Sequence, residues 1–533
     1  MTRDRDAARS AIQDGSTSLG IELGSTRIKA VLVDAEGTIL ATGAHGWSDR
    51  LEDGHWTYSL DDVATGLAAA YAALVLDSTR AWGVAPASLG AVGVSAMMHG
   101  YLAFDADDAL LVPFRTWRNS TTGAAATLLG STLGRSMPLR WSASHLLQVV
   151  LDREEHLARL ARITTLAGHV HVLLGGHPVL GADDASGMFP LLADGSDYDG
   201  AVLDAFDRLA AEHGATDLRV RELLPSIRPV GEDAGTLSDA GAALLDPTGR
   251  LLPGAALCPP EGDAGTGMVA TRALEPGTGN VSVGTSIFAM VVVDGEAPTL
   301  PDVDVVATPE GAPVAMVHCN NGVSELGAWA TLLGELSEAS GHRMEPDETF
   351  AAMLSAANDA TSEGIVAYNF VAGEHALGLQ DGRPIVVRAA GTTLTLGGFV
   401  RAQLLSAFAT LQQGMQVLRE HGVRVDELVA HGGLFRTTGI AQRMLAASLE
   451  APVRVSASAG EGGAWGMALL AAYRLARVEG EERPLRTWLQ QRSGIDAGTV
   501  VAADPALVAE SRAYADRWRA ALPLARLAPE VVA

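Results

Sequence analysis

The sequence predicts a duplicated two-domain α/β protein, and three observations support this fold class. The chain has 533 residues, which is too long for one ordinary domain. Strand-like and helix-like segments alternate along it, as is typical of α/β architectures. A hairpin whose turn contains a glycine and two hydroxyl residues occurs once in each half. With 48% hydrophobic and 19% charged residues, the composition is that of a globular protein.

The internal repeat is the most informative of these observations. Its first copy runs from Leu23 to Asp34 and its second from Val283 to Asp294. In each copy an apolar strand enters the glycine turn, and a β-branched strand leaves it and ends at the aspartate. Chance similarity between apolar hairpins is the alternative interpretation. We favour a duplication in which the two halves face each other across a cleft.

The other elements are predicted from hydrophobic periodicity. In the first half we expect amphipathic helices over 61–77 and 144–159 and a buried strand over 91–96. In the second half we expect a core helix over 399–421, a strand ending in a glycine turn over 429–433, and a helix over 440–449. The turn-rich segment 275–279 predicts a domain boundary. The expected divisions are a polar tail (1–16), an N-terminal domain (17–277), a C-terminal domain (278–480) and a helical extension (481–533) without assigned chemistry.

Charge and cysteine content limit the classes of function. The formal charge of −25 disfavours nucleic acid and anionic membrane surfaces as partners. Cys258 and Cys319 are too few for a disulfide framework and have no metal-ligand spacing. The polar N-terminus lacks the apolar core of a signal peptide, and no stretch has the roughly 18 apolar residues of a membrane span. We therefore expect a cytoplasmic protein.

The glycine-rich segments indicate phosphate chemistry. A turn of glycine and hydroxyl residues lets the backbone approach a phosphate closely, and two such turns suit a triphosphate. Neither a P-loop nor a dinucleotide-binding glycine motif occurs. A third segment, Glu261–Gly267, places Asp263 in a glycine-rich turn before a helix. Its carboxylate suits proton abstraction from a hydroxyl and magnesium binding, and ordinary helix capping is the alternative.

These segments resemble the FGGY family of carbohydrate kinases, within the superfamily of sugar kinases, actin and the Hsp70 ATPase domain. The resemblance extends from about Leu19 to Tyr473 and rests on segments in the family's order: 20–26, 95–100, 262–264, 281–286, 431–433 with 442–445, and 461–468. It implies two ribonuclease H-like, actin-like ATPase domains with a catalytic cleft between them. It also implies transfer of the γ-phosphate of ATP to a terminal hydroxyl of a small sugar, such as xylulose or ribulose, or of a polyol. Dimers are common among such relatives.

The resemblance also implies a role for each matching residue. Asp263 is expected to be the catalytic base. The ATP-binding residues are expected to be Gly24, Ser25, Thr26, Gly284, Thr285, Ser286, Gly432 and Gly433. The expected substrate-binding residues are Met98, His99, Trp117 and Asp263, and the expected ligands of Mg²⁺ are Glu22 and Asp263.

The chain departs from the family pattern at two places. Glu22 stands where the family usually has aspartate, which puts the geometry of metal binding in question. Ala96 and Met97 replace the usual Gly-Gln, which puts the identity of the sugar in question. Two other functions therefore remain as alternatives: an ATP-regulated clamp, as in the actin and Hsp70 branches, and a catalytically inactive sugar or ATP sensor. Asp263 and the Met-His-Gly segment favour the kinase.

Several further residues have two interpretations. His99 is a sugar ligand or a structural histidine, Trp117 stacks on substrate or fills the core, and Asn119 falls one position from the family's asparagine. Trp56 is expected to pack. His169 and His171 are expected on one face of a strand, without a third ligand for a metal. Asp183 and Asp184 are expected in a solvated turn or near the sugar, and Glu374 with His375 in a structural role at the domain interface.

Overall fold

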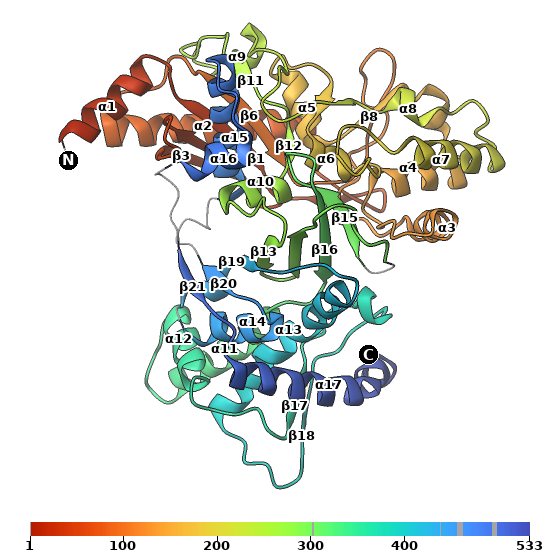
Figure 1. Cartoon of the computed structure of the whole chain (residues 1–533), viewed down its shortest axis with the longest axis vertical. Helices are drawn as coiled ribbons and strands as arrows, with labels where there is room; N and C mark the ends of the chain where they lie inside the picture. The colour runs from red at the N-terminus through yellow and green to blue at the C-terminus, as the bar shows by residue number, and fades with distance from the viewer. Residues whose placement is uncertain (1, 301–302, 438, 456–461, 493–497, 533) are drawn as a thin grey trace. The chain divides into compact units, whose positions relative to one another are not determined.

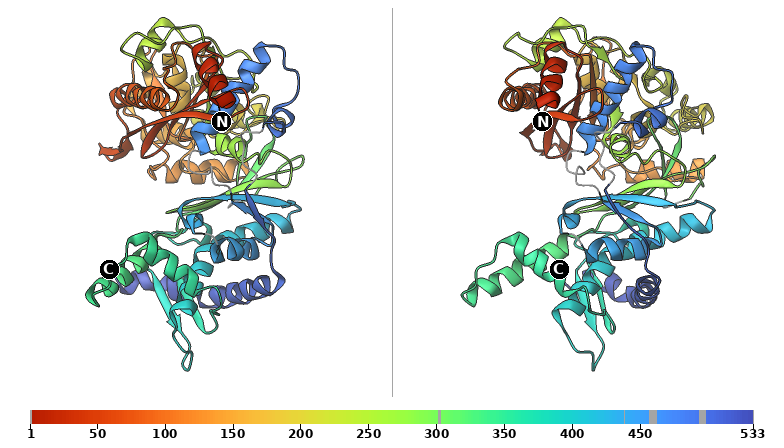
Figure 2. Two further views of the ribbon diagram at one scale, coloured as in Figure 1. Left: turned by 90° about the vertical axis from the view of Figure 1, so that its left-hand side faces the viewer. Right: turned by 60° about the vertical axis from the view of Figure 1, so that its left-hand side comes forward.

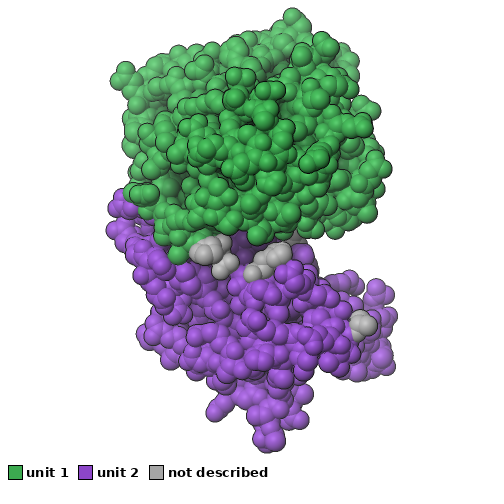
Figure 3. Space-filling view, turned by 90° about the vertical axis from the view of Figure 1, so that its right-hand side faces the viewer, with its two compact units in different colours: residues 1–275, 295–314, 461–496 green, residues 276–294, 315–460, 497–533 purple. Residues whose placement is uncertain are grey.

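The computed structural model of the chain describes residues 2–300, 303–437, 439–455, 462–492 and 498–532 (Figure 1). The chain forms two compact units, each assembled from three stretches of sequence (Figure 3). Unit 1 contains residues 1–275, 295–314 and 461–496, and unit 2 contains residues 276–294, 315–460 and 497–533. Among the described residues, none of the helices is both long and apolar enough to cross a membrane.

Unit 1 is built on a mixed sheet with the strand order β11-β6-β1-β2-β3, and β12 also pairs with β6. Its strands are β1 (Ser18–Leu23), β2 (Arg27–Val33), β3 (Ile39–Gly46), β6 (Ala91–Ala96), β11 (Ala256–Leu257) and β12 (Glu261–Gly262). The strands β1, β2 and β3 form an antiparallel meander, whereas β6 runs parallel to β1, β11 and β12. The sheet therefore combines a hairpin repeat with parallel strands whose carboxyl ends lie at one edge.

Helices cover both faces of this sheet. Apolar residues of α2 (Leu60–Trp82) pack in one core with the side chains of Leu19, Ile21 and Leu23. The opposite face receives α15 (Gly462–Val478), for which Gly20 makes room: a Cβ atom there would lie 2.2 Å from the backbone oxygen of Ala464. Figures 1 and 2 show α15 lying across β1 and β6. A helix from the C-terminal part of the chain thus packs on the sheet that the N-terminal strands form.

The remaining elements of unit 1 are not strands of this sheet. They are α1 (Thr2–Gln13), β4 (Arg50–Glu52), β5 (His55–Thr57), β7 (Leu102–Phe104), α3 (Gly123–Leu133), α4 (Ser142–Asp152), η1 (Glu155–Arg159), β8 (Arg162–Thr164), α5 (Leu166–Leu173), β9 (Val179–Leu180), α6 (Ala182–Ser186), α7 (Gly200–Glu212), α8 (Val220–Leu223), β10 (Ser226–Ile227), α9 (Asp239–Leu245), α10 (Asp263–Ala270), β15 (Asp304–Ala307) and α16 (Leu485–Gln490).

Unit 2 repeats the hairpin and the parallel strands. Within it the strand order is β16-β14-β13-β19-β20-β21. These strands are β13 (Thr278–Val283), β14 (Ile287–Val292), β16 (Pro313–Cys319), β19 (Glu427–His431), β20 (Val453–Val455) and β21 (Thr499–Val501). The hairpin β13–β14 is antiparallel, and β19 runs parallel to both β13 and β20. The internal repeat predicted from the sequence is therefore present as one hairpin in each unit.

Helices complete unit 2, some packed on its sheet and others packed on those helices. They are α11 (Ser324–Ala339), α12 (Pro346–Ala356), α13 (Leu396–Glu420), α14 (Ile440–Leu449) and α17 (Pro505–Val531). Most residues of α13 are buried, which makes it the core helix of the unit. The smaller elements are β17 (Ile365–Tyr368), η2 (His375–Leu377), β18 (Ile385–Arg388) and η3 (Gly433–Arg436).

Two local predictions from the sequence are wrong. The helix expected over 144–159 is interrupted because Arg153 adopts a left-handed conformation (φ 53°), which ends α4 before η1 begins. The segment with His169 and His171 is the helix α5, whose N-terminus is capped by the Thr165 side chain. Residues two apart on a helix point in different directions, so the two imidazoles do not share a face. Periodicity alone does not distinguish a short apolar helix from a strand.

Candidate functional site

Three of the segments that resemble the family motifs meet at one edge of the sheet in unit 1. The parallel strands β1, β6 and β12 end in register, with Leu23 and Gly262 each paired to Ala96. The Met97 amide donates to the carbonyl of Leu23 (3.0 Å), which continues the pairing into the next segment. Ligands of α/β sheets bind outside the carboxyl ends of parallel strands. This register therefore brings Gly24–Thr26, Met97–Gly100 and Asp263 to one place.

Asp263 is the first residue of α10, and its position separates it from ordinary capping. The N-cap of this helix is Gly262, so the carboxylate is not the N-cap. The Met98 amide donates to Asp263 Oδ1 at 3.3 Å, which joins the carboxylate to the Met-His-Gly segment. Burial, followed by the negative charge of Glu22, raises the pKa of the Asp263 carboxyl to about 7. A carboxylate with this pKa suits proton transfer near neutral pH.

This pKa predicts a pH dependence of turnover. Only the ionised form of Asp263 accepts a proton, so kcat/KM should rise as the pH increases from 6 to 8, with an apparent pKa of about 7. The Glu22→Gln variant removes the charge that raises this pKa, so its rising limb should move to lower pH. The measurement is kcat/KM against pH with Mg·ATP as the nucleotide, because kcat/KM reports the pKa values of the enzyme before the ion arrives. A wild-type profile that is flat from pH 6 to 8 would contradict this role for the group.

Glu22 lies on β1 and is held by the N-terminus of α15. Its Oε2 accepts a hydrogen bond from the Ala464 amide (3.3 Å) and lies 3.9 Å from Lys29 Nζ. A Cβ atom on Gly463 would lie 2.2 Å from Glu22 Oε1, so glycine at 463 accommodates the longer carboxylate. Gly463 is the local sequence feature that permits this contact, which was not predicted from the sequence. Glu461, at the start of the same motif, lies outside the described residues.

The turn Gly24–Thr26, predicted to bind phosphate, is held through its carbonyl groups. The indole of Trp47 donates to Gly24 O at 2.7 Å, and the hydroxyl of Tyr58 donates to Ser25 O at 2.7 Å. The backbone amide of Trp47 donates to Thr26 O at 3.2 Å. The two rings pack with centroids 4.3 Å apart. Sequence reasoning missed both aromatic residues, which fix the direction of the turn's peptide groups.

The Met-His-Gly segment is buried and has an unusual backbone. His99 has a φ of +72°, uncommon for a residue with a side chain, and Gly100 follows with a φ of +92°. The ring nitrogen Nδ1 of His99 lies 3.1 Å from the carbonyl oxygen of Gly187. The side chains of His99 and Met98 are 6% and 5% exposed. Left-handed backbone at such a segment is a feature of functional sites, and here it directs His99 toward Gly187.

Trp117 and Asn119 lie in one segment but have different surroundings, because Trp117 is exposed and Asn119 is buried. Trp117 is 40% exposed, so it does not fill the core. Asn119 is buried, and its amide group pairs with the backbone of Trp56, accepting from Trp56 N (2.7 Å) and donating to Trp56 O (2.8 Å). Trp56 packs against the guanidinium of Arg118, 3.9 Å from the ring centroid.

A cluster of three buried carboxyl groups lies behind Asp263. The prediction of a solvated turn at Asp183 and Asp184 is wrong, because these residues form part of α6 and are 0% and 1% exposed. Glu261 is also fully buried, and its Oε2 accepts from the Asp183 amide (3.1 Å). Asp183 Oδ2 accepts from the Gly265 amide of α10 at 3.0 Å. Burial, followed by the negative charge of Asp184, raises the pKa of the Asp183 carboxyl well above its usual range.

Gly181 makes room for this cluster, which gives a test of its contribution to stability. A Cβ atom on Gly181 would lie 2.0 Å from Glu261 Oε1 and would displace that carboxyl from the Asp183 amide. We expect Gly181→Ala to lower the free energy of unfolding by about 2–4 kcal/mol, from overpacking and a lost buried hydrogen bond. The control is Gly200→Ala at the first position of α7, where a Cβ atom meets nothing within 4 Å. Equal unfolding midpoints in urea for both variants would contradict this assignment.

Unit 2 contains a cavity of about 490 Å³ at the second hairpin. It is lined by Val283, Gly284, Thr285, Val323, Ser324, Gly327, Asp347, Phe350, Gly433, Leu434 and Thr437. Three predicted ATP residues are among these, namely Gly284, Thr285 and Gly433, and Ser286 belongs to the same hairpin turn. The walls from α11 and α12 were missed because their residues form no phosphate motif.

Two glycines allow neighbouring loops to approach the hairpin turn of unit 2. A Cβ atom on Gly322 would lie 2.1 Å from Gly284 O, and one on Gly432 would lie 2.0 Å from Val283 O. Gly432 also has a φ of +127°, a region that is essentially limited to glycine. The Gly322 amide donates to Thr285 O at 2.7 Å. The predicted adenosine loop thus reaches the hairpin because β13 and β19 are parallel neighbours.

Glu374 supports this hairpin from within unit 2. It is 1% exposed, and its carboxylate accepts from the backbone amides of Asn320 (3.1 Å) and Asn321 (3.2 Å). These residues precede Gly322, whose amide binds the hairpin turn. The contacts of Glu374 are therefore structural, and the side chain of His375 lies outside the described residues.

Comparisons with known proteins agree with this architecture. The N-terminal domain of the FGGY family of carbohydrate kinases matches residues 17–245, and the C-terminal domain of the same family matches residues 279–475. No curated protein matches the sequence. The fold is similar to that of a ligand-bound xylulose kinase from Lactobacillus acidophilus, with a TM-score of 0.77 and 17% identity over 95% of this chain and 98% of the other.

Two other solved structures have the same fold. A gluconate kinase from Lactobacillus acidophilus has a TM-score of 0.77 and 18% identity over 96% of this chain and 98% of its own. A glycerol kinase from Plasmodium falciparum, solved with ADP, has a TM-score of 0.73 and 14% identity over 96% and 98% of the two chains. Such identities establish the fold. The matches to both family domains establish more: this chain is a member of the FGGY family of carbohydrate kinases, phosphotransferases that use ATP and an alcohol group as acceptor.

Proposed function

We propose that this chain transfers the γ-phosphate of ATP to a terminal hydroxyl of a small sugar, either a ketopentose such as xylulose or ribulose or a polyol. The observation that carries the proposal is the environment of Asp263. Its carboxylate lies at the carboxyl ends of three parallel strands, bonded to the Met98 amide, with a pKa raised to about 7. A base of this strength beside the sugar segment is what proton abstraction from an alcohol needs.

Each part of the site then has a task. Asp263 accepts the proton of the attacking hydroxyl through a carboxylate oxygen, while Met98, His99 and the exposed Trp117 bind and orient the acceptor. The turns Gly24–Thr26 and Gly284–Ser286 present backbone amides and hydroxyl groups to the phosphates. Gly432 and Gly433 provide space for the adenosine beside the cavity of unit 2. Positioning and charge stabilisation supply most of the catalysis in phosphoryl transfer.

The residues present fit a magnesium ion that arrives with ATP. Among the described residues, no group of three or more histidine, cysteine, aspartate or glutamate side chains is arranged to hold a metal. Magnesium is commonly held by one or two carboxylates together with substrate phosphates, and Glu22 and Asp263 provide such a pair. Glu22 and Asp263 would hold the ion, whose charge would offset the repulsion from Glu22 that raises the pKa of Asp263. The ion would neutralise charge on the phosphates.

A cytoplasmic location suits the two cysteines. Cys258 and Cys319 are both buried free thiols. Reduced cysteines are usual in the cytosol, where disulfides are rare. We therefore place the proposed activity in the cytoplasm.

Formation of ADP across a panel of acceptors tests the proposed function. Wild-type protein with Mg·ATP is incubated with ketoses, aldoses, polyols and sugar acids, and ADP release is followed by a coupled assay. We expect one ketopentose or polyol to stimulate ADP release strongly over the rate without acceptor. Binding of ATP without stimulation by any compound would instead favour the inactive sensor.

A further inference from the structure

The C-terminal residues beyond the family match form part of the nucleotide-binding unit. The matched C-terminal domain ends at residue 475, whereas β21 and α17 follow it. The strand β21 pairs antiparallel with β20 at the edge of the sheet. The helix α17 packs on α13, α14 and β17 (Figures 1 and 2), burying Tyr514 and Trp518. The sequence predicted a helical extension over 481–533 with no assigned chemical role. The contacts of α17 indicate a role in positioning its neighbours.

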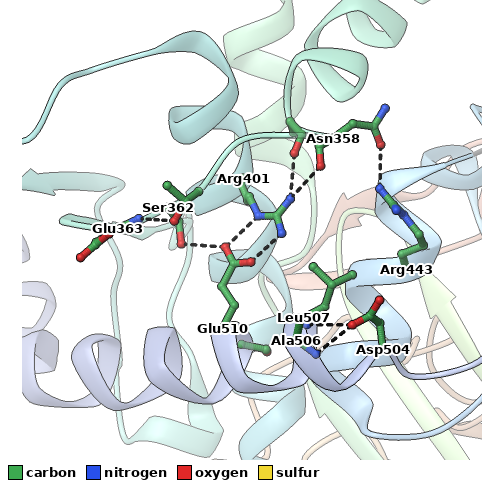
Figure 4. A network of polar contacts seen from close by, with 12 residues as sticks. Asn358, Ser362, Glu363, Arg401, Arg443, Asp504, Ala506, Leu507 and Glu510 are labelled. Atoms are coloured by element: carbon green, nitrogen blue, oxygen red, sulfur yellow. Dashed lines mark hydrogen bonds and ion pairs between the residues drawn. The ribbon is translucent and has the colours of Figure 1, made fainter.

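An ion pair between the buried Arg401 and the partly buried Glu510 links α17 to the end of α12 (Figure 4). Arg401 of α13 is 4% exposed and binds both carboxylate oxygens of Glu510 on α17, at 2.7 and 2.5 Å. Its Nη1 atom donates to the carbonyls of Ala357 (2.9 Å) and Asn358 (3.3 Å). Ala357 is the C-cap of α12, where carbonyls lack partners within the helix. One guanidinium thus connects Glu510 to the end of α12.

The same network continues to α14. Arg443, in the first turn of α14, donates to Asn358 Oδ1 at 3.0 Å. The hydroxyl of Ser362 donates to Glu510 Oε1 at 3.4 Å, so the loop after α12 is held at a second point. Figure 4 shows these side chains converging between α17 and the loop. The loop after α12 is therefore bound to Glu510 and Arg401, and the first turn of α14 is bound to the same loop through Asn358.

Both connected elements bear on the cavity of unit 2. The helix α12 contributes Asp347 and Phe350 to its lining, and Gly433, Leu434 and Thr437 lie in the segment that leads into α14. Displacement of α12 or α14 would change the width of the cavity. Each donor named in this network has an acceptor. Polar networks whose groups all have partners hold the elements that they join in one arrangement.

We propose that Glu510 is a positioning residue for nucleotide binding: through Arg401 it holds the end of α12, and with it one wall of the cavity. The inference rests on the proposed function in so far as that cavity receives the nucleotide. Without Glu510 the buried guanidinium loses its counter-charge, and a buried charge without its partner forces rearrangement. By thermodynamic linkage, a bound nucleotide must in turn stabilise the docking of α17.

The first test uses Glu510→Gln in the full chain, with the acceptor found in the panel assay. We expect the KM for ATP to rise about tenfold, equivalent to about 1.4 kcal/mol of binding, while kcat and the KM for the acceptor change less than about twofold. Arg401→Leu, which also removes the bonds to Ala357 and Asn358, should raise the KM for ATP at least as much.

The matched control is Tyr514→Phe on the same helix. The hydroxyl of Tyr514 accepts from Ala367 N (3.0 Å) and donates to Ala402 O (2.9 Å), so its loss destabilises α17 without touching α12. This variant should lower the unfolding temperature and leave the KM for ATP unchanged. If the KM for ATP rises in all variants in proportion to their lost stability, or rises in none, the positioning role is overturned.

Hydrogen–deuterium exchange of the wild type covers the case in which a variant fails to fold. Adding Mg·ADP should slow exchange in three segments together: 357–363, 440–447 and 505–512. Protection of cavity-lining segments such as 284–287 without protection of 505–512 would overturn the inference while leaving nucleotide binding intact. Protection of none of these segments would overturn both the inference and the assignment of the cavity, which separates the two failures.

Discussion

Replacing Asp263 with asparagine is expected to lower kcat by about 10³-fold, within the range of about 10²–10⁴ that general acid–base catalysis contributes. Asparagine keeps the size of the side chain and an oxygen that accepts from the Met98 amide, but it has no site basic enough to take the hydroxyl proton. The affinity for ATP without Mg²⁺, measured by calorimetry, should change little because the cavity of unit 2 is untouched.

The matched control for this change is Asp239→Asn. Asp239 is the first residue of α9, as Asp263 is the first residue of α10, but Asp239 is exposed. Its substitution should leave kcat unchanged. Retention of wild-type kcat by Asp263→Asn, at a pH above 8, would mean that another group is the base.

The second large effect is expected from Gly432→Ala. A Cβ atom at this position would lie 2.0 Å from a backbone oxygen, Val283 O, and the φ of +127° is unfavourable for alanine. Such strain costs of order 1–3 kcal/mol before the clash is counted, and relief requires the loop to leave the hairpin. We expect the affinity for ATP to fall by about tenfold or more and the unfolding temperature to fall as well.

The Gly433→Ala variant separates the effect of backbone strain from the effect of adding a methyl group. The neighbouring glycine has nothing within 4 Å of an added Cβ atom. This variant should keep the unfolding temperature of the wild type, because its backbone needs no special conformation. Similar unfolding temperatures for the two alanine variants would show that close approach at Gly432 does not hold the loop. Differential scanning fluorimetry of both variants and ATP titration by calorimetry provide the comparison.

The parts of the fold predicted from the sequence are those set by local chemistry. The strand 91–96 has the predicted bounds because it is a short buried apolar run after Gly90, and the helix 440–449 because its apolar periodicity is regular. The short apolar run at His169 was predicted wrongly because both periods fit it, and the Thr165 cap decides for helix. Residues 461–496 belong to unit 1, and α15 packs closely on its sheet at glycines such as Gly20. No local sequence pattern indicates this long-range contact.

The candidate site shows the same division. Residues in glycine motifs, such as Asp263 and Gly284, could be proposed as site residues because their backbone conformations impose a sequence pattern. Trp47 and Tyr58 were missed because they hold the first turn through contacts distant in the chain. The burial of Asp183 was also missed, since Glu261 and Gly181 form its environment only after folding and appear separately as an ordinary acid and an ordinary glycine. Complementary pairs of this kind need the tertiary structure.

The most direct test of the proposed kinase is the ³¹P NMR spectrum of the product formed from Mg·ATP and the stimulating acceptor. We predict a new phosphomonoester signal split into a triplet by two protons, which places the phosphate on a terminal CH₂–O group. The signal should be absent at equal times with Asp263→Asn. Two results would contradict transfer to a terminal hydroxyl. One is inorganic phosphate as the only product besides ADP, and the other is a phosphomonoester doublet from an internal CH–O group.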